Sequence, residues 1–302
     1  MLRSLLIICS ISFICEFINI PEGTGNAGVK KGIIIIKNLA YADSSRNNKL
    51  DLYIPDYIQG IVPVILWIHG GGFRKGNKVD YSNSEDIENL ARKGYVVASI
   101  DYHFIDEEIW PAQIYDTKSA IRWIRANASK YRINQDRIGI IGLSAGANLS
   151  MLAGTSGDII NVEGTTGGNN GYSSKVQATV NISGASDYSA IFNDCVNQSN
   201  YDCERLINKN FELFGCDSVD RCFELELEAS AVSYISHDDP PAMILNGENE
   251  LIPLAQAVVF YNKLMVKQVE AKLVIAPGNM HSKIIYYQYF DEIVDFFDAC
   301  LK

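Results

Sequence analysis

Ser144 occupies a position suited to a nucleophile. It stands in Gly142-Leu143-Ser144-Ala145-Gly146, between an apolar run at 137–142 and small residues at 147–153. A serine with glycines two positions away on each side is typical of a sharp turn from a buried strand into a helix, which lifts the hydroxyl above the sheet. The backbone N–H of Ala145 would then face the oxyanion that forms when Ser144 attacks a carbonyl. The alternative is a helix N-cap serine between closely packed glycines.

A glycine-rich segment, His69-Gly70-Gly71-Gly72-Phe73, ends another apolar run. Neither GxxxxGK[ST] nor GxGxxG fits this segment, so a phosphate-binding loop is disfavoured. We expect the backbone N–H groups of Gly71 and Gly72 to join that of Ala145 in stabilising the oxyanion. His69 is interpreted as a hydrogen-bonding residue that orients this loop rather than as a general base.

A nucleophilic serine of this kind is followed in the chain by an acid and then by a histidine. His281 comes just after the last apolar run and is the expected base, with a surface-loop histidine as the alternative. The acid should follow the preceding run, where Glu248 and Glu250 both lie. We favour Glu250, because its separation of three residues from Gly247 lets the turn finish before the carboxylate points inward. Glu248 and Asp187 are the alternatives.

Apolar runs bounded by turn residues alternate with helical patterns along most of the chain. Runs that are polar only at their ends suit strands buried on both faces of a parallel sheet. They lie at 62–69, 95–100, 137–142, 176–183, 241–246 and 272–276. Apolar residues at helical spacing predict helices at 111–130, 254–266 and 286–297, and runs at 33–37 and 50–54 predict an opening antiparallel hairpin. The alternation predicts an α/β fold with a mostly parallel central sheet flanked by helices.

Four cysteines fall in one polar stretch, Cys195, Cys203, Cys216 and Cys222, and Cys300 lies near the C-terminus. Their gaps lack the close CxxC pairs of zinc sites, so a metal site is not expected. In an oxidising compartment this clustering predicts two local disulfides. The pairing stays open, and Cys300 is either unpaired or replaces one of the four. Residues 188–230, which interrupt the strand–helix alternation, are predicted to form a small Cys-rich insertion.

The N-terminus has the pattern of a secretory signal. Arg3 precedes an apolar run at 5–14, which spans only about 15 Å as a helix. Gly25 and Ala27 match the small residues of a cleavage site. We predict a signal peptide at residues 1–27, one domain at 28–302, and a secreted or periplasmic location. The alternative is an uncleaved anchor, in which case the N-terminal segment alone would contact a membrane.

Composition narrows the range of partners. The 302 residues are 47% hydrophobic and 21% charged, the balance of a folded globular protein. The net charge is −10, and the pI is about 4.9. Nucleic acids and anionic membrane surfaces attract clustered Lys and Arg, so neither is an expected partner.

These motifs together resemble an α/β-hydrolase of the hormone-sensitive-lipase-like group, within the branch of bacterial feruloyl and acetyl-xylan esterase-like (BD-FAE-like) proteins. The resemblance covers almost all of the chain after the signal. It rests on LDLYIP (50–55), PVILWIHGGGF (63–73), WPAQIYDTKSAIRWIRANASKY (110–131), RIGIIGLSAGANLS (137–150), GGNNGYSSKVQA (167–178), HDDPPAMILNGENE (237–250) and IAPGNMHS (275–282). Two departures fall at the acid: the family's His-Gly is Asn246-Gly247 here, and the segment from Glu250 to Pro253 is one residue short. The cysteine cluster is also outside the family pattern.

The resemblance implies a serine carboxylesterase that acts on short-chain, acetyl-type esters. In this sequence it assigns Ser144 as nucleophile, His281 as base and Glu250 as acid, with oxyanion donors in the HGGG loop. It implies no metal and no organic cofactor, and a small-molecule or glycan-linked ester as substrate. Two rivals remain: a serine exopeptidase of the same fold, and a secreted binding protein that has lost catalysis. The acyl group, the alcohol and the oligomeric state stay open.

Overall fold

The computed structural model describes residues 27–30, 32–79, 84–197 and 203–302. The predicted signal peptide at 1–27 lies outside these ranges except for Ala27 and stays a prediction, as does its cleavage. Within the described ranges, no helix combines the length and the apolar character needed to cross a bilayer.

The central sheet has nine strands in the order β1-β2-β3-β5-β4-β6-β7-β8-β9. β1 to β3 and β5 pair in antiparallel fashion, whereas β5, β4 and the strands from β6 to β9 run parallel. The strands are β1 (Ala27–Lys30), β2 (Ile33–Ala40), β3 (Lys49–Pro55), β4 (Val62–Ile68), β5 (Val96–Ile100), β6 (Ile133–Leu143), β7 (Ala178–Ile182), β8 (Ala242–Gly247) and β9 (Ala271–Ala276). The mostly parallel sheet and its opening hairpin are as predicted from sequence.

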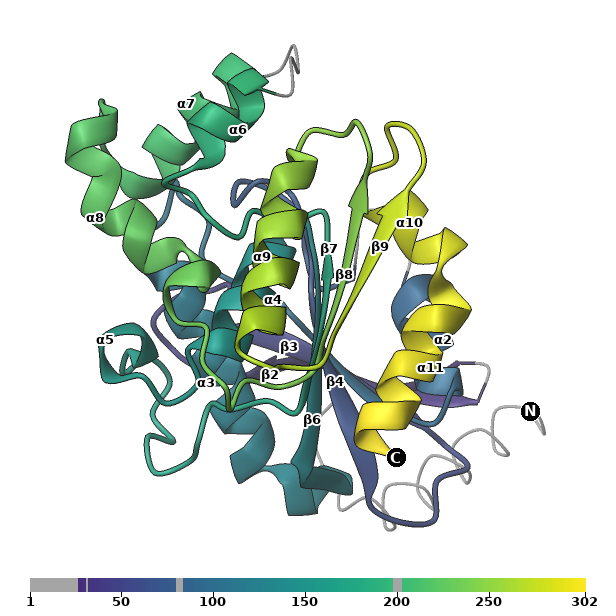
Figure 1. The fold of residues 1–302 in the computed structure, drawn as a ribbon. Helices are drawn as coiled ribbons and strands as arrows, with labels where there is room; N and C mark the ends of the chain where they lie inside the picture. The colour runs from purple at the N-terminus through teal and green to yellow at the C-terminus, as the bar shows by residue number, and fades with distance from the viewer. Residues whose placement is uncertain (1–26, 31, 80–83, 198–202) are drawn as a thin grey trace.

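Helices cover both faces of the sheet (Figure 1). One face carries α3 (Ala112–Ala126), α4 (Ala145–Thr155) and α9 (Leu254–Val266), and the other carries α2 (Glu85–Arg92), α10 (Lys283–Gln288) and α11 (Phe290–Leu301). Side chains of β4 alternate between the two cores: Leu66 packs in the first, Trp67 in the second, and both are fully buried. Burying one large apolar side chain stabilises the fold by roughly 1.5–3 kcal/mol, which explains the continuous apolar runs.

The helix predicted at 286–297 is two helices. Tyr289 lies between the end of α10 and the start of α11, and its φ of −112° and ψ of 21° break the helical path. The backbone N–H of Tyr289 still bonds to Ile285, and its carbonyl accepts from Ile293, so hydrogen bonding continues across the break. The periodicity of apolar residues alone did not reveal this change of direction.

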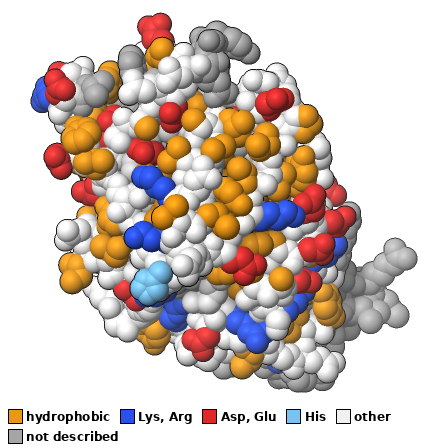
Figure 2. Space-filling view, in the orientation of Figure 1, with side chains coloured by type: hydrophobic (Ala, Val, Ile, Leu, Met, Phe, Trp, Pro, Cys, Tyr) orange, Lys and Arg blue, Asp and Glu red, His pale blue; other side chains and the backbone are white. Residues whose placement is uncertain are grey.

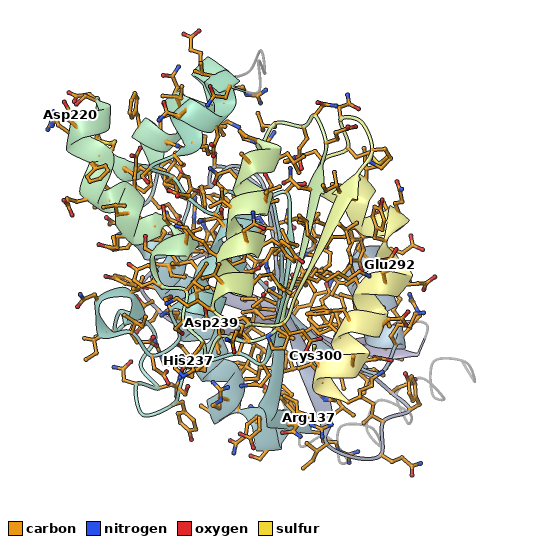
Figure 3. All side chains as sticks on the ribbon, in the orientation of Figure 1. Arg137, Asp220, His237, Asp239, Glu292 and Cys300 are labelled. Atoms are coloured by element: carbon orange, nitrogen blue, oxygen red, sulfur yellow. A yellow bond between two sulfur atoms is a disulfide. The ribbon has the colours of Figure 1, made fainter. Side chains whose placement is uncertain are left out.

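The predicted Cys-rich insertion consists of α6 (Ile191–Asn197), α7 (Cys203–Phe214) and α8 (Val219–Ala229). These helices lie beside the edge at which the parallel strands end (Figure 1). The disulfides are Cys195–Cys203 and Cys216–Cys222, with Cα atoms 5.5 and 5.7 Å apart. Each joins two consecutive cysteines of the four. The first links α6 to the start of α7, and the second links the segment after α7 to α8. Cys300 on α11 is free, and in Figure 3 it lies far from Asp220 on α8.

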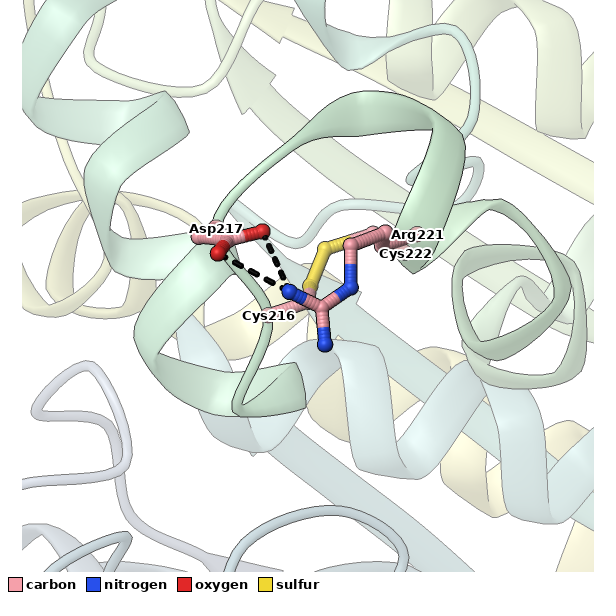
Figure 4. Close-up of a disulfide and its surroundings, with 4 residues drawn as sticks. All are labelled: Cys216, Asp217, Arg221 and Cys222. Atoms are coloured by element: carbon pink, nitrogen blue, oxygen red, sulfur yellow. Dashed lines mark hydrogen bonds and ion pairs between the residues drawn. A yellow bond between two sulfur atoms is a disulfide. The ribbon is translucent and has the colours of Figure 1, made fainter.

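The second disulfide has an ion pair beside it. Arg221 donates to both carboxylate oxygens of Asp217 at 2.9 Å, next to the Cys216–Cys222 bond (Figure 4). Both side chains are about 70% exposed, and an exposed pair of this kind adds at most about 1 kcal/mol. The covalent bond is therefore a stronger link between the end of α7 and α8 than the ion pair.

A buried histidine–carboxylate pair connects the segment after β5 with α3 and with the segment before β3. Nδ1 of His103 lies 2.7 Å from the carboxylate of Asp116 on α3, and the His103 backbone N–H donates to the same oxygen. Asn48, just before β3, donates to the other oxygen of Asp116 at 2.8 Å. The hydrogen bond with Asp116 is the main cause that raises the pKa of His103 above its ordinary value, and burial opposes it.

Because its folded-state pKa is raised, His103 stabilises the fold most below the unfolded pKa of about 6.5, and this stabilisation is lost as the pH rises through the folded pKa. We expect H103Q to lower Tm by about 2 °C more at about pH 5.5 than at about pH 9. Thermal unfolding at both pH values measures this difference. The exposed His237, replaced by Gln, is the matched control. A Tm deficit for H103Q that is equal at both pH values would contradict the role of the pair.

Candidate active site

Ser144 lies at a strained turn between β6 and α4. Its φ is 54° and its ψ is −117°, a conformation that costs a non-glycine residue on the order of 1–3 kcal/mol. A Cβ on Gly142 would overlap the carbonyl of Gly146, and one on Gly146 would overlap the carbonyls of Ile68 and His69. Ser144 makes no side-chain capping bond to α4. The glycines are therefore required by close backbone packing, and the hydroxyl is not used as an N-cap.

His281 follows β9 and faces this serine. Its Nε2 lies 3.1 Å from Oγ of Ser144, and its Nδ1 contacts the carboxylate of Glu250. The Glu250 side chain is fully buried, whereas that of His281 is about one-third exposed. The three side chains thus form one hydrogen-bonded chain that runs from the interior to the surface.

The loop after β8 fixes the orientation of the Glu250 carboxylate. Its second oxygen accepts from the backbone N–H of Gly247 at 2.8 Å. Asn246 donates to the carbonyls of Gly247 and Ile252 at 3.0 and 3.1 Å and so closes the loop from inside. A Cβ on Gly247 would overlap the carbonyl of Met280, because the histidine loop passes directly over it.

The two alternative carboxylates serve other contacts. Glu248 is exposed and accepts from the backbone N–H of Gly278 at 3.4 Å. Asp187 accepts from the hydroxyl of Ser189 at 2.6 Å and from the backbone N–H of Ala190, just before α6. Of the three candidates, Glu250 is the one in contact with Nδ1 of His281.

The glycine loop after β4 packs directly against the serine. A Cβ on Gly70 would lie 3.2 Å from that of Ser144, and Gly71 and Gly72 have φ values of 124° and 63°. His69 is buried beneath the loop, with Nδ1 2.7 Å from the carbonyl oxygen of Gly70. Its ring stacks on Tyr102 at 4.4 Å, and the Tyr102 hydroxyl donates to the His69 carbonyl. The His69 ring thus supports the loop from below.

Two cavities meet at Ser144. The narrower one holds about 50 Å³ beside Ala145 and has mostly apolar walls, including Phe73, Tyr188 and Leu213. The wider one holds about 310 Å³ and is bounded by His281 and the glycine loop. Since a single water needs about 10–15 Å³ on this scale, the narrow cavity has room for only a few heavy atoms.

The insertion helix α7 forms a wall shared by both cavities. Leu206 and Lys209 line the narrow cavity, and Arg205 and Lys209 line the wide one. Sequence analysis missed these residues as site residues. These residues are one, three and four positions apart, a spacing that could have indicated a shared helix surface. It could be used only once α7 and the disulfide at Cys203 were known.

The remaining histidines lie elsewhere. His103 is committed to Asp116, and His237 lies in the loop before β8, at the end of the sheet opposite α6 and α7 (Figure 3). Among the described residues, no group of three His, Cys, Asp or Glu side chains is arranged to hold a metal ion.

Comparisons with known proteins agree with this architecture. The chain is 31% identical to a probable carboxylic ester hydrolase, LipM of Mycobacterium tuberculosis, over 75% of this chain and 51% of that protein. It is 28% identical to the esterase LipC of the same organism over 72% of this chain and 52% of that one. The chain thus spans about half the length of these curated relatives.

Two solved structures are also similar. A truncated form of a carbohydrate esterase from gut microbiota aligns with a TM-score of 0.78 and 28% identity, over 92% of this chain and 98% of that one. A bifunctional GH43-CE protein of Bacteroides eggerthii aligns with a TM-score of 0.80 and 26% identity, over 91% of this chain and 36% of that one.

The sheet, the helices on its two faces and the strand–turn–helix at Ser144 define an α/β-hydrolase. The BD-FAE family model matches residues 50–264, which is more than half of the chain. The chain therefore belongs to the BD-FAE family.

Proposed function

We propose that this protein is a serine carboxylic-ester hydrolase that works through an acyl-enzyme on Ser144. The observation that carries the proposal is the hydrogen-bonded chain from Ser144 through His281 to the buried Glu250. The esterase names of the mycobacterial relatives support the same reaction class.

In the first half-reaction His281 acts as the general base. Its Nδ1–H donates to Glu250, which leaves Nε2 to accept the proton of the Ser144 hydroxyl as Oγ attacks the ester carbonyl. The negative charge of Glu250 stabilises the imidazolium that forms. Because Glu250 is fully buried and held by Gly247, its charge acts at a fixed position with little screening by water.

The tetrahedral oxyanion is held by backbone N–H groups of Gly71, Gly72 and Ala145. Ala145 is the first residue of α4, where unpaired N–H groups and the helix dipole favour negative charge. One such donor contributes about 3 kcal/mol to transition-state stabilisation where it has been measured. The imidazolium then gives its proton to the leaving alcohol, and water repeats the cycle on the acyl-enzyme.

We assign the acyl group to the narrow cavity. The wide cavity holds His281, which must protonate the alcohol oxygen, so the alcohol leaves on that side and the acyl group occupies the other. A volume of about 50 Å³ suits a short acyl group of the acetyl type. The similar carbohydrate esterase structure supports an ester on a sugar as one candidate substrate.

We also propose that the protein is exported. Two disulfides within one insertion are typical of proteins in an oxidising compartment, which supports the predicted signal at 1–27, a mature domain at 28–302, and a secreted or periplasmic location.

Replacing Ser144 by Ala should lower kcat/KM for an aryl acetate by about 10⁴-fold or more, because alanine has no hydroxyl with which to form the acyl-enzyme. The Tm should change little, since the Ser144 hydroxyl makes no capping bond to α4 and its partner His281 is about one-third exposed. Initial-rate kinetics and thermal unfolding measure the two quantities. Retained turnover in S144A would exclude Ser144 as the nucleophile.

The acid is tested by a matched pair of glutamates two residues apart. E250Q should lower kcat by about 10³- to 10⁴-fold, because the amide cannot stabilise the imidazolium or fix its tautomer. E248Q removes the same charge from an exposed position and should change kcat by no more than about twofold. Equal losses in the two variants would show that the acid is misassigned.

Acyl length is tested with nitrophenyl esters from acetate to palmitate. We expect kcat/KM to fall steeply beyond the shortest esters, because the cavity beside Ala145, which Tyr188 and Leu213 help to line, holds only about 50 Å³. The L213A variant should shift the optimum toward longer chains by opening that wall. A wild-type preference for long chains would contradict the acetyl-type assignment.

A further inference from the structure

The width of the narrow cavity depends on where α7 lies. This helix contributes three buried side chains to the cavity wall, Leu206, Asn210 and Leu213. Its opposite side is exposed at Glu204 and Glu212. The helices α6, α7 and α8 lie at the upper left of Figure 1, and the same corner of Figure 2 carries charged as well as hydrophobic side chains, as expected of a surface in contact with water. The links between α7 and the rest of the molecule therefore fix one wall of the cavity.

The end of α7 is held by non-covalent contacts. The backbone N–H of Trp110 donates to the carbonyl of Leu213 at 3.0 Å. The buried ring of Phe214 packs edge-on against the rings of Trp110 and Tyr188, with centroids 6.3 and 5.4 Å apart. Aromatic pairs of this kind are stabilising beyond the area that they bury. None of these contacts involves the second disulfide, so they should persist without it.

The helix α6 is anchored to the body of the molecule by a buried glutamine. Gln256 on α9 is fully buried, and its side-chain oxygen accepts from the backbone N–H groups of Ser186 and Asp187 at 2.9 and 2.8 Å. Its Nε2 donates to the carboxylate of Asp194 on α6 at 2.6 Å. A hydrogen bond to a charged group is stronger than one between neutral groups.

A covalent bond continues this path into α7. Cys195 directly follows the anchored Asp194 and is 1% exposed. Its disulfide partner, Cys203, is the first residue of α7. Leu206 lies three residues farther along, about one helical turn, and lines the narrow cavity. The disulfide thus joins the buried glutamine, through α6, to the turn of α7 that forms the cavity wall.

We infer that the Cys195–Cys203 disulfide determines the acyl length that the site accepts, because it holds the Leu206 side of α7 against the narrow cavity. The second disulfide, beyond the packed end of α7, does not share this role. The inference rests on the proposed function, since it uses the assignment of the acyl group to the narrow cavity. The two cysteines act through the position of Leu206, so they are positioning residues.

The test compares the two disulfides in double variants. For each protein, kcat/KM for 4-nitrophenyl butyrate is divided by that for the acetate, so the intrinsic reactivities of the esters cancel between proteins. In C195S/C203S this ratio should rise by about tenfold, since each methylene that gains room in an apolar cavity is worth about fourfold. C216S/C222S loses a disulfide of similar sequence separation, 6 against 8 residues, and should change the ratio by no more than about twofold. A purely structural role would lower Tm without changing the ratio.

Reduction tests the same bond without replacing its cysteines. In C216S/C222S, the remaining disulfide of the described residues is Cys195–Cys203. Dithiothreitol gives two electrons and two protons to this bond, which leaves two thiols, and itself becomes a cyclic disulfide. It is removed by gel filtration in oxygen-free buffer before the assay, because thiols cleave nitrophenyl esters. The ratio should rise as in C195S/C203S and return when oxidised glutathione restores the bond, with alkylation and mass spectrometry reporting the thiols.

The outcomes separate the two proposals. A ratio that stays at the wild-type value in C195S/C203S and in reduced C216S/C222S overturns the inference and leaves the esterase standing. An equal rise in C216S/C222S before reduction overturns it as well. If C195S/C203S does not fold, the reduced C216S/C222S protein decides. Failure of the wild-type protein to hydrolyse either ester overturns the proposed function, and this inference falls with it.

Discussion

The arrangement of this site depends on how closely backbone segments approach one another around Ser144. The turn from β6 into α4 holds Ser144 at a φ of 54°, and it exists only because Gly142 and Gly146 leave room for neighbouring carbonyls. Gly70 brings a second loop against the same residue. The local cost of the turn is on the order of 1–3 kcal/mol and is offset by β6, whose Ile138, Ile140 and Ile141 are fully buried in the two cores.

The contact between His281 and Glu250 depends on a different feature, a short loop after β8 that is held together by internal hydrogen bonds. Where the resembling family has His-Gly, this chain has Asn246-Gly247, and the amide of Asn246 bonds to the carbonyls of Gly247 and Ile252. The side chain of Glu250 is fully buried, and its second carboxylate oxygen accepts from the backbone N–H of Gly247. With both departures from the family pattern present, Glu250 still contacts Nδ1 of His281.

Much of the fold could be predicted from sequence, because strands buried on both faces leave continuous apolar runs and the glycines around Ser144 have a specific spacing. The proximity of Ser144, Glu250 and His281 also followed from chain order, since loops after parallel strands meet at one edge of the sheet. Pairing of the cysteines did not follow, because it depends on where α6, α7 and α8 pack. The break at Tyr289 and the role of α7 as a cavity wall could not be predicted either, because both depend on how the helices pack.

The central claim is that Ser144 is a nucleophile activated by His281. Treatment with an aryl alkylphosphonate, followed by intact-mass and peptide mass spectrometry, tests it most directly. We expect one phosphonyl group per chain, attached to Ser144, with labelling suppressed in an H281A variant whose Tm matches that of the wild type. An unlabelled chain, or a label on another serine, would contradict the account and favour a hydrolase-like binding protein.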